Sequence, residues 1–158
     1  MRTSQAILQR KWSWSTWGAQ SAPLTVPLGT AAPGIFTDDG SGTGQGAVLN
    51  QDYSLNGPSN PAARGSIAIF YATGIGPTSP CFDGQVWQSN LPSATLPVSV
   101  DVGGSGAQVL YDGQAPDLVS GVAQFNIVIP SNASTGIVSL TLAVGGIFSQ
   151  PGVTIAVK

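Results

Sequence analysis

The carboxylate and thiol side chains of this chain, the ones best suited to acid–base or metal chemistry near neutral pH, are seven aspartates and one cysteine, Cys81. Histidine and glutamate do not occur in the sequence. Their absence excludes serine–histidine catalysis, histidine-bound metal sites and acid/base pairs built on glutamate. Two aspartates across a cleft can hydrolyse a glycoside, but Asp83 and Asp112 each precede a glycine, as is typical of a turn. We therefore expect a protein that is not an enzyme.

Asp38 and Asp39 open a loop, residues 38–46, in which glycines alternate with small polar residues. Adjacent carboxylates and backbone carbonyls are the kind of oxygen ligands of which Ca²⁺ takes about six to eight. However, the acidic residues do not alternate as in an EF-hand, and the loop lacks the lysine and the helix of a phosphate-binding loop. The sequence favours a solvated loop and no cofactor, with calcium at Asp38 and Asp39 as the alternative.

Aromatic side chains offer the candidate binding surfaces. Trp12 and Trp14 would point the same way on a strand and could stack on a sugar. Tyr53 and Trp87 lie outside the clear strand patterns, and Trp87 falls in residues 76–97, the longest stretch without one. Long loops carry function more often than strands do. These four residues are the candidate contacts for a polysaccharide or another surface partner.

The distribution of charged and of apolar residues argues against two further classes of partner, nucleic acid and the membrane interior. Only 8% of residues are charged, the formal net charge is −2, and the five basic residues are scattered or terminal. Without a basic stripe to neutralise phosphates, we expect no binding to nucleic acid. No apolar stretch approaches the ~20 residues that a membrane-spanning helix needs, so we expect no membrane span.

Apolar residues alternate with polar ones in seven or eight short segments, and no segment has the period of a helix. The candidate strands cover residues 24–28, 46–50, 67–71, 98–102, 108–111, 125–129, 138–144 and 153–157. This spacing predicts an all-β protein, an immunoglobulin-like antiparallel β-sandwich with an extra N-terminal strand and a loose leader. Its predicted core consists of Ile69, Tyr71, Val100, Val109, Phe125, Ile127, Leu140, Leu142 and Ile155.

The predicted organisation has three parts. Residues 1–22 form a leader that is flexible or of cloning origin. Residues 23–37 contain a strand left over from a preceding β-sandwich, and residues 38–158 form the immunoglobulin-like domain. The exposed strand edges of this arrangement permit self-association.

From about residue 24 to its end, the chain carries a series of short motifs in a fixed order. They are residues 32–37 (APGIFT), 44–52 (GQGAVLNQD), 71–77 (YATGIGP), 96–100 (LPVSV), 107–111 (AQVLY), 124–130 (QFNIVIP) and 149–157 (SQPGVTIAV). In these motifs the chain resembles a family of uncharacterised C-terminal domains of large secreted proteins in Solibacter-like acidobacteria. The resemblance implies an immunoglobulin-like appendage of a longer exported chain, and it supplies no catalytic residues.

The resulting functional hypothesis is a non-catalytic structural or spacer module of an exported bacterial protein, secreted or at the cell surface. A neighbouring domain of the longer chain would be its partner. The alternative is a module that binds carbohydrate or another surface partner through exposed aromatic residues.

Overall fold

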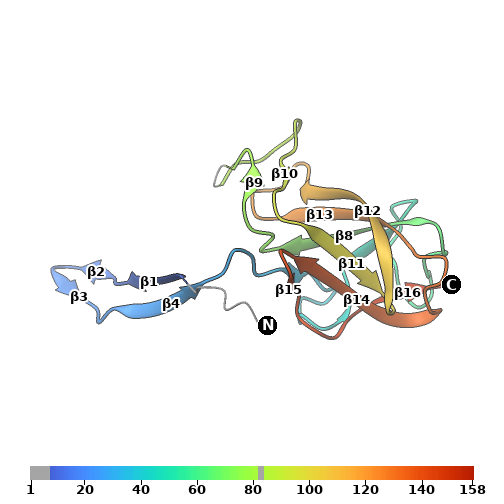
Figure 1. Ribbon diagram of the computed structural model, residues 1–158, viewed down its shortest axis with the longest axis horizontal. Helices are drawn as coiled ribbons and strands as arrows, with labels where there is room; N and C mark the ends of the chain where they lie inside the picture. Colours follow the sequence, from blue (N-terminus) through green and yellow to red (C-terminus); the bar gives the residue numbers. More distant parts are fainter. Residues whose placement is uncertain (1–7, 82–83) are drawn as a thin grey trace, which may run out of the picture. The chain divides into compact units, whose positions relative to one another are not determined.

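The computed structural model describes residues 8–81 and 84–158, and all regular structure within them is β-strand. The all-β prediction is confirmed. The chain divides into two compact units, Met1–Thr30 and Ala31–Lys158 (Figure 1). The first seven residues of the predicted leader lie outside the described residues.

The first unit is a two-stranded ribbon. Strand β1 (Leu8–Trp12) pairs antiparallel with β4 (Leu24–Leu28), and the short β2 (Ser15–Thr16) pairs with β3 (Ala19–Gln20). Trp17 and Gly18 turn the chain with φ angles of 51° and 81°, the positive values that a tight hairpin turn requires. Residues 8–22 therefore form paired strands where the sequence predicted a loose leader.

Seven strands of the second unit follow the order of an immunoglobulin constant domain. One group, in spatial order, is β7 (Val48–Asn50), β8 (Ile67–Thr73), β13 (Ala123–Val128) and β12 (Ser105–Gln114). The other is β11 (Val98–Val102), β14 (Gly136–Val144) and β16 (Val153–Val157). Lettered A to G along the chain, these groups are A-B-E-D and C-F-G, as in immunoglobulin domains. The predicted fold class is confirmed.

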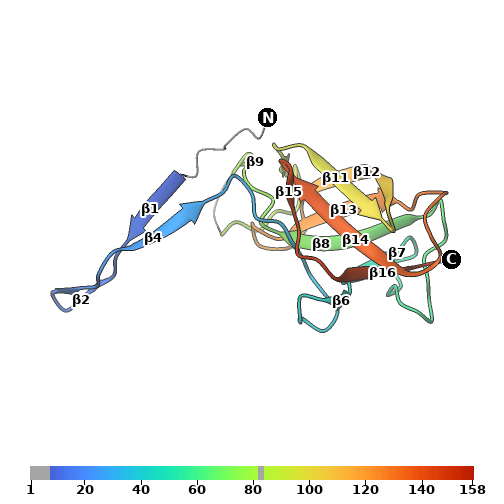
Figure 2. The same cartoon turned by 60° about the horizontal axis from the view of Figure 1, so that its bottom comes forward.

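The two groups are joined at both sides, so the sheet curls into a ring. The first residues of β12 pair with β11 and the later ones with β13, and the register shifts between Val109 and Tyr111. On the other side, β5 (Gly34–Ile35) pairs with β8, and β6 (Gly44–Gln45) runs parallel to β16 (Figure 2). Backbone hydrogen bonds from Asp38 N to Gln45 O (2.9 Å) and from Ala47 N to Phe36 O (2.8 Å) connect the segment of β5 to the segment of β6. We call this junction, residues 34–47 between β8 and β16, the seam.

This seam places residues 34–37 inside the second unit. The two units divide after Thr30, whereas the sequence analysis placed the domain boundary after residue 37. The remaining short strands lie beside this ring: β9 (Thr78–Ser79) pairs with β10 (Ser93–Ala94), β10 pairs with β12, and β15 (Ile147–Phe148) pairs with β14.

Most of the predicted core is buried in the second unit, where Phe125 stacks on Phe70 with ring centroids 5.0 Å apart. Strand β8 is the exception. Its residues in the core cluster are Ala68, Phe70 and Ala72, whereas the predicted Ile69 is buried outside that cluster and Tyr71 is only half-buried. Alternate residues of a strand face opposite ways, and the stacking of Phe70 on Phe125 fixes which set faces inward. Val109 is partly buried against the same cluster.

Two side-chain amides replace strand partners at the seam. The amide of Asn56 accepts from Ala156 N and donates to Ala156 O, both at 2.9 Å, on the last strand. The amide of Gln150 accepts from Ile35 N at 2.9 Å and donates to Ile35 O at 2.6 Å. Each amide makes the pair of hydrogen bonds that one residue of a neighbouring strand would make.

Replacing Asn56 with alanine is expected to lower the free energy of unfolding by about 2 kcal/mol, because the N–H of Ala156 loses its partner. Urea unfolding followed by circular dichroism measures the change. The control is Asn132→Ala, the same substitution at an exposed residue, with an expected change within about 0.5 kcal/mol. Equal unfolding curves for the two variants would contradict a structural role for Asn56.

Candidate functional site

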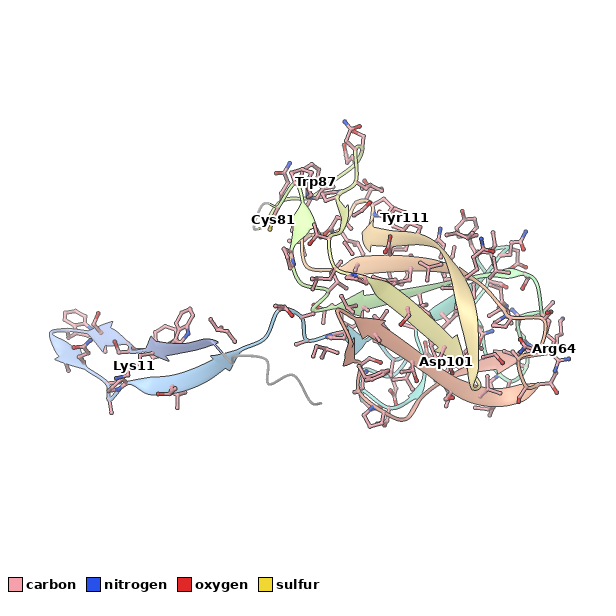
Figure 3. The ribbon with its side chains drawn as sticks, viewed as in Figure 1. Lys11, Arg64, Cys81, Trp87, Asp101 and Tyr111 are labelled. Atoms are coloured by element: carbon pink, nitrogen blue, oxygen red, sulfur yellow. The ribbon has the colours of Figure 1, made fainter. Side chains whose placement is uncertain are left out.

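A hollow of the second unit lies where the segment after β8 meets the turn after β12. Its volume is about 480 Å³. It is lined by Thr73, Gly74, Ile75, Gly76, Thr78, Cys81, Gln114, Ser120, Gly121, Val122 and Ala123. The long segment 76–97, which the sequence analysis singled out, supplies part of this lining. Figure 3 labels two residues of this region, Cys81 and Trp87.

Gly74 determines how the segment after β8, which forms one wall of the hollow, leaves the strand. Gly74 follows β8 with φ +71°, and its carbonyl accepts from Ala32 N at 2.8 Å. A Cβ at this position would lie 1.9 Å from the carbonyl oxygen of Ala32. The chain therefore leaves β8 in a backbone conformation that only glycine adopts here without displacing its neighbour.

Gln114, the last residue of β12, organises the opposite wall. Its side chain is 4% exposed, and Nε2 donates to the carbonyls of Ala115 (3.3 Å), Leu118 (3.1 Å) and Val119 (3.0 Å). These bonds hold the turn after β12 around the amide nitrogen. No donor among the described residues reaches Oε1 of Gln114, and this oxygen is not among the buried polar atoms without a partner, so it keeps contact with solvent.

Trp87 is attached to the same turn. Its indole Nε1 donates to Oγ of Ser120 at 3.1 Å, and its carbonyl accepts from Asp117 N at 2.8 Å. Oγ of Ser120 in turn donates to the carbonyl of Gln85 at 2.9 Å. The ring is half-buried and held in one orientation, beside a second hollow of about 430 Å³ lined by residues 85–90.

The electrostatic character of the site is neutral. Neither hollow has an aspartate, lysine or arginine among the described residues that line it. Close by, Tyr111 donates from Oη to the carbonyl of Gln114 at 2.6 Å. Burial raises the pKa of Tyr111, and the neighbouring carboxylate of Asp112 adds to that shift. The arrangement can stack and hydrogen-bond a neutral molecule.

The other predicted aromatic contacts lie elsewhere in the chain. Tyr53 is 73% exposed in the turn after β7 and lines neither hollow. Trp12 and Trp14 belong to the first unit, with 55% and 81% of their surface exposed. Trp12 lies opposite Leu24 in the ribbon. Of the four predicted residues, Trp87 is the one that lines either of these two hollows.

The loop of Asp38 and Asp39, for which calcium was the alternative to a solvated loop, is held by its own hydrogen bonds. Oδ1 of Asp39 accepts from Ser41 N at 3.0 Å, and this backbone bond lowers the pKa of Asp39. Asp38 donates its N–H to Gln45 O at 2.9 Å as part of the seam. Within residues 8–81 and 84–158, no three acidic, histidine or cysteine side chains gather to hold a metal ion. Calcium at Asp38 and Asp39 stays the alternative to a solvated loop.

The sequence indicated Trp87 as a candidate through its place in a long loop, but it did not indicate Gln114 or Ser120. Comparison with protein-family models, with curated proteins and with solved structures gives no match to this chain. No helix capable of spanning a bilayer occurs in the part of the chain that the structure describes. The site must therefore be interpreted from its own geometry.

Proposed function

We propose that this protein is a non-catalytic immunoglobulin-like structural module of an exported bacterial protein, placed outside the cytoplasm next to another domain. The observation that carries the proposal is the ring of strands in A-B-E-D and C-F-G order, closed by β6 on β16. Such a sandwich keeps its shape through burial and backbone hydrogen bonds, as a rigid spacer requires. The low charged fraction and the motifs that resemble a secreted family support the same role.

Cell fractionation and exchange of the module test this proposal. The chain is expected in the medium or the surface fraction of its source cells. Replacing residues 31–158 by an unrelated immunoglobulin-like domain of similar length is expected to preserve the activity of the neighbouring domain. A purely cytoplasmic location, or a reproducible turnover that disappears when one aspartate is replaced, would contradict the proposal.

A second function, binding of carbohydrate, is favoured by the geometry of Trp87. Proteins commonly bind sugars by stacking an aromatic ring on the apolar face of the sugar and by hydrogen-bonding its hydroxyls with amides. The Trp87 ring is held by Ser120, and the same hollow includes the amides of Gln85, Gln88 and Asn90. This arrangement matches both requirements, so we propose Trp87 as the stacking residue.

Replacing Trp87 with alanine is expected to weaken binding to a neutral polysaccharide about tenfold or more. Losing the buried part of an aromatic side chain costs roughly 1.5–3 kcal/mol, and 1.4 kcal/mol is about tenfold. Affinity electrophoresis on a panel of polysaccharides measures the retention. Tyr53→Ala, which removes an aromatic ring outside the hollow, is the control and is expected to bind as the parent does. No retention of the parent on any polysaccharide would overturn this second function.

A further inference from the structure

We propose that the hollow beside Gln114 binds one neutral sugar ring and that a hydroxyl of this ring donates a hydrogen bond to Oε1 of Gln114. This inference rests on the proposed carbohydrate function and adds a second binding position to it. The ring over Trp87 and the ring in this hollow would belong to the same oligosaccharide.

The size and the lining of the hollow define the class of ligand. Its volume of about 480 Å³ lies within the ~300–1,000 Å³ typical of small-molecule sites. Ile75, Val122 and Ala123 offer apolar contact, and Thr73 offers a hydroxyl. The hydroxyl of Thr78 donates to the carbonyl of Pro80 at 3.0 Å, so it can only accept from a ligand. A hexose has the matching surface, with C–H groups on its faces and hydroxyls around its edge. Among the described residues, this lining contains none that is charged, which favours a neutral sugar over a sugar acid.

Gln114 supplies the most specific contact. Three backbone carbonyls accept from its Nε2, and this fixes which end of the amide is the nitrogen. The residue as a whole is 4% exposed. Oε1 accepts no hydrogen bond from the described residues and is not among the buried polar atoms that lack a partner, so it keeps contact with solvent. A ligand hydroxyl in the hollow would replace water as the donor to Oε1.

Ser120 connects the two binding positions. It lines the Gln114 hollow, and its Oγ accepts the indole N–H of Trp87 at 3.1 Å. The residue that orients the stacking ring therefore also forms a wall of the neighbouring hollow. An oligosaccharide with one unit on Trp87 has the next position within the same loop region.

Cys81 provides a direct measure of occupancy, because it lines the hollow, is exposed and is the single cysteine of the chain. The experiment measures how fast the Cys81 thiol of the full chain reacts with an aromatic disulfide reagent. Glucose, galactose and mannose are the neutral probes, and glucuronic acid is the charged one. At about three times its Kd, a bound neutral sugar is expected to slow the reaction about fourfold. Glucuronic acid is expected to leave the rate unchanged.

Two aliphatic residues give a matched pair of variants. Val122 lines the hollow, so Val122→Phe is expected to fill it and abolish protection of Cys81 by sugar. Ile137 is 62% exposed on β14 and does not line it, so Ile137→Phe is expected to retain protection. Equal melting temperatures of the two variants show that neither result comes from unfolding. Protection that persists in Val122→Phe overturns the proposal.

The failure of this inference is distinguishable from failure of the carbohydrate function itself. If polysaccharide is retained through Trp87 but no neutral monosaccharide protects Cys81, the Gln114 position is wrong and the stacking site stands. If a monosaccharide protects Cys81 while no polysaccharide is retained, the Gln114 position stands and the Trp87 proposal fails. Protection by glucuronic acid equal to that by glucose contradicts the neutral class.

Discussion

The Phe125→Ala variant is expected to lose about 3–5 kcal/mol of unfolding free energy, the largest effect of any single core substitution here. The ring of Phe125 has no exposed surface and stacks on Phe70 with a centroid distance of 5.0 Å. Its strand, β13, lies between β8 and β12. Removing the ring therefore leaves a cavity that the neighbouring strands cannot close without breaking their ladders.

Urea or thermal unfolding followed by circular dichroism measures this loss. Phe148→Ala is the matched control, because Phe148 is 71% exposed on the short strand β15. The control is expected to change stability by no more than about 0.5 kcal/mol. If Phe125→Ala unfolds at the same urea concentration as the control, the assignment of Phe125 to the core is wrong.

The Gly74→Ala variant is expected to lose about 2–4 kcal/mol. A left-handed backbone costs a residue with a Cβ roughly 1–2 kcal/mol. The new Cβ would also lie 1.9 Å from the carbonyl oxygen of Ala32. The backbone must move apart there, which weakens the hydrogen bond from Ala32 N to Gly74 O, worth roughly 0.5–1.5 kcal/mol.

Two other glycines separate these causes. Gly104 has φ +84° with nothing within 4 Å of an added Cβ, so Gly104→Ala isolates the backbone cost. Gly106 has open space and no positive φ, so Gly106→Ala tests neither cause. The expected order of destabilisation, measured by urea unfolding, is Gly74, then Gly104, then Gly106. A Gly74→Ala variant no less stable than Gly104→Ala would refute the close approach to Ala32.

The sequence was informative where one face of a strand is apolar and the other is polar. Residues 98–102, 125–129 and 138–144 alternate in this way, and the glycine pairs 103–104 and 145–146 form turns with positive φ angles. In contrast, residues 67–72 are apolar at almost every position. Alternation alone therefore could not identify Phe70 as the core residue of β8.

The missed features depend on contacts between distant parts of the chain. Asn56 pairs with a residue 100 positions away and Gln150 with one 115 positions away, so no local pattern marks either amide. The same applies to the proposed binding site. Trp87 is marked by its long loop, whereas Gln114 acquires its role only when the turn after β12 closes around its side chain.

The closed seam has a consequence for the behaviour of the protein in concentrated solution. With 8% charged residues, copies of the chain repel one another only weakly. Unpaired strand edges are the usual sites where such proteins aggregate. In the second unit, β6 covers β16 and the amides of Asn56 and Gln150 occupy backbone groups beside the seam. Resistance to aggregation is therefore supported by hydrogen bonds that occupy the backbone N–H and C=O groups at this edge, rather than by repulsion between surface charges.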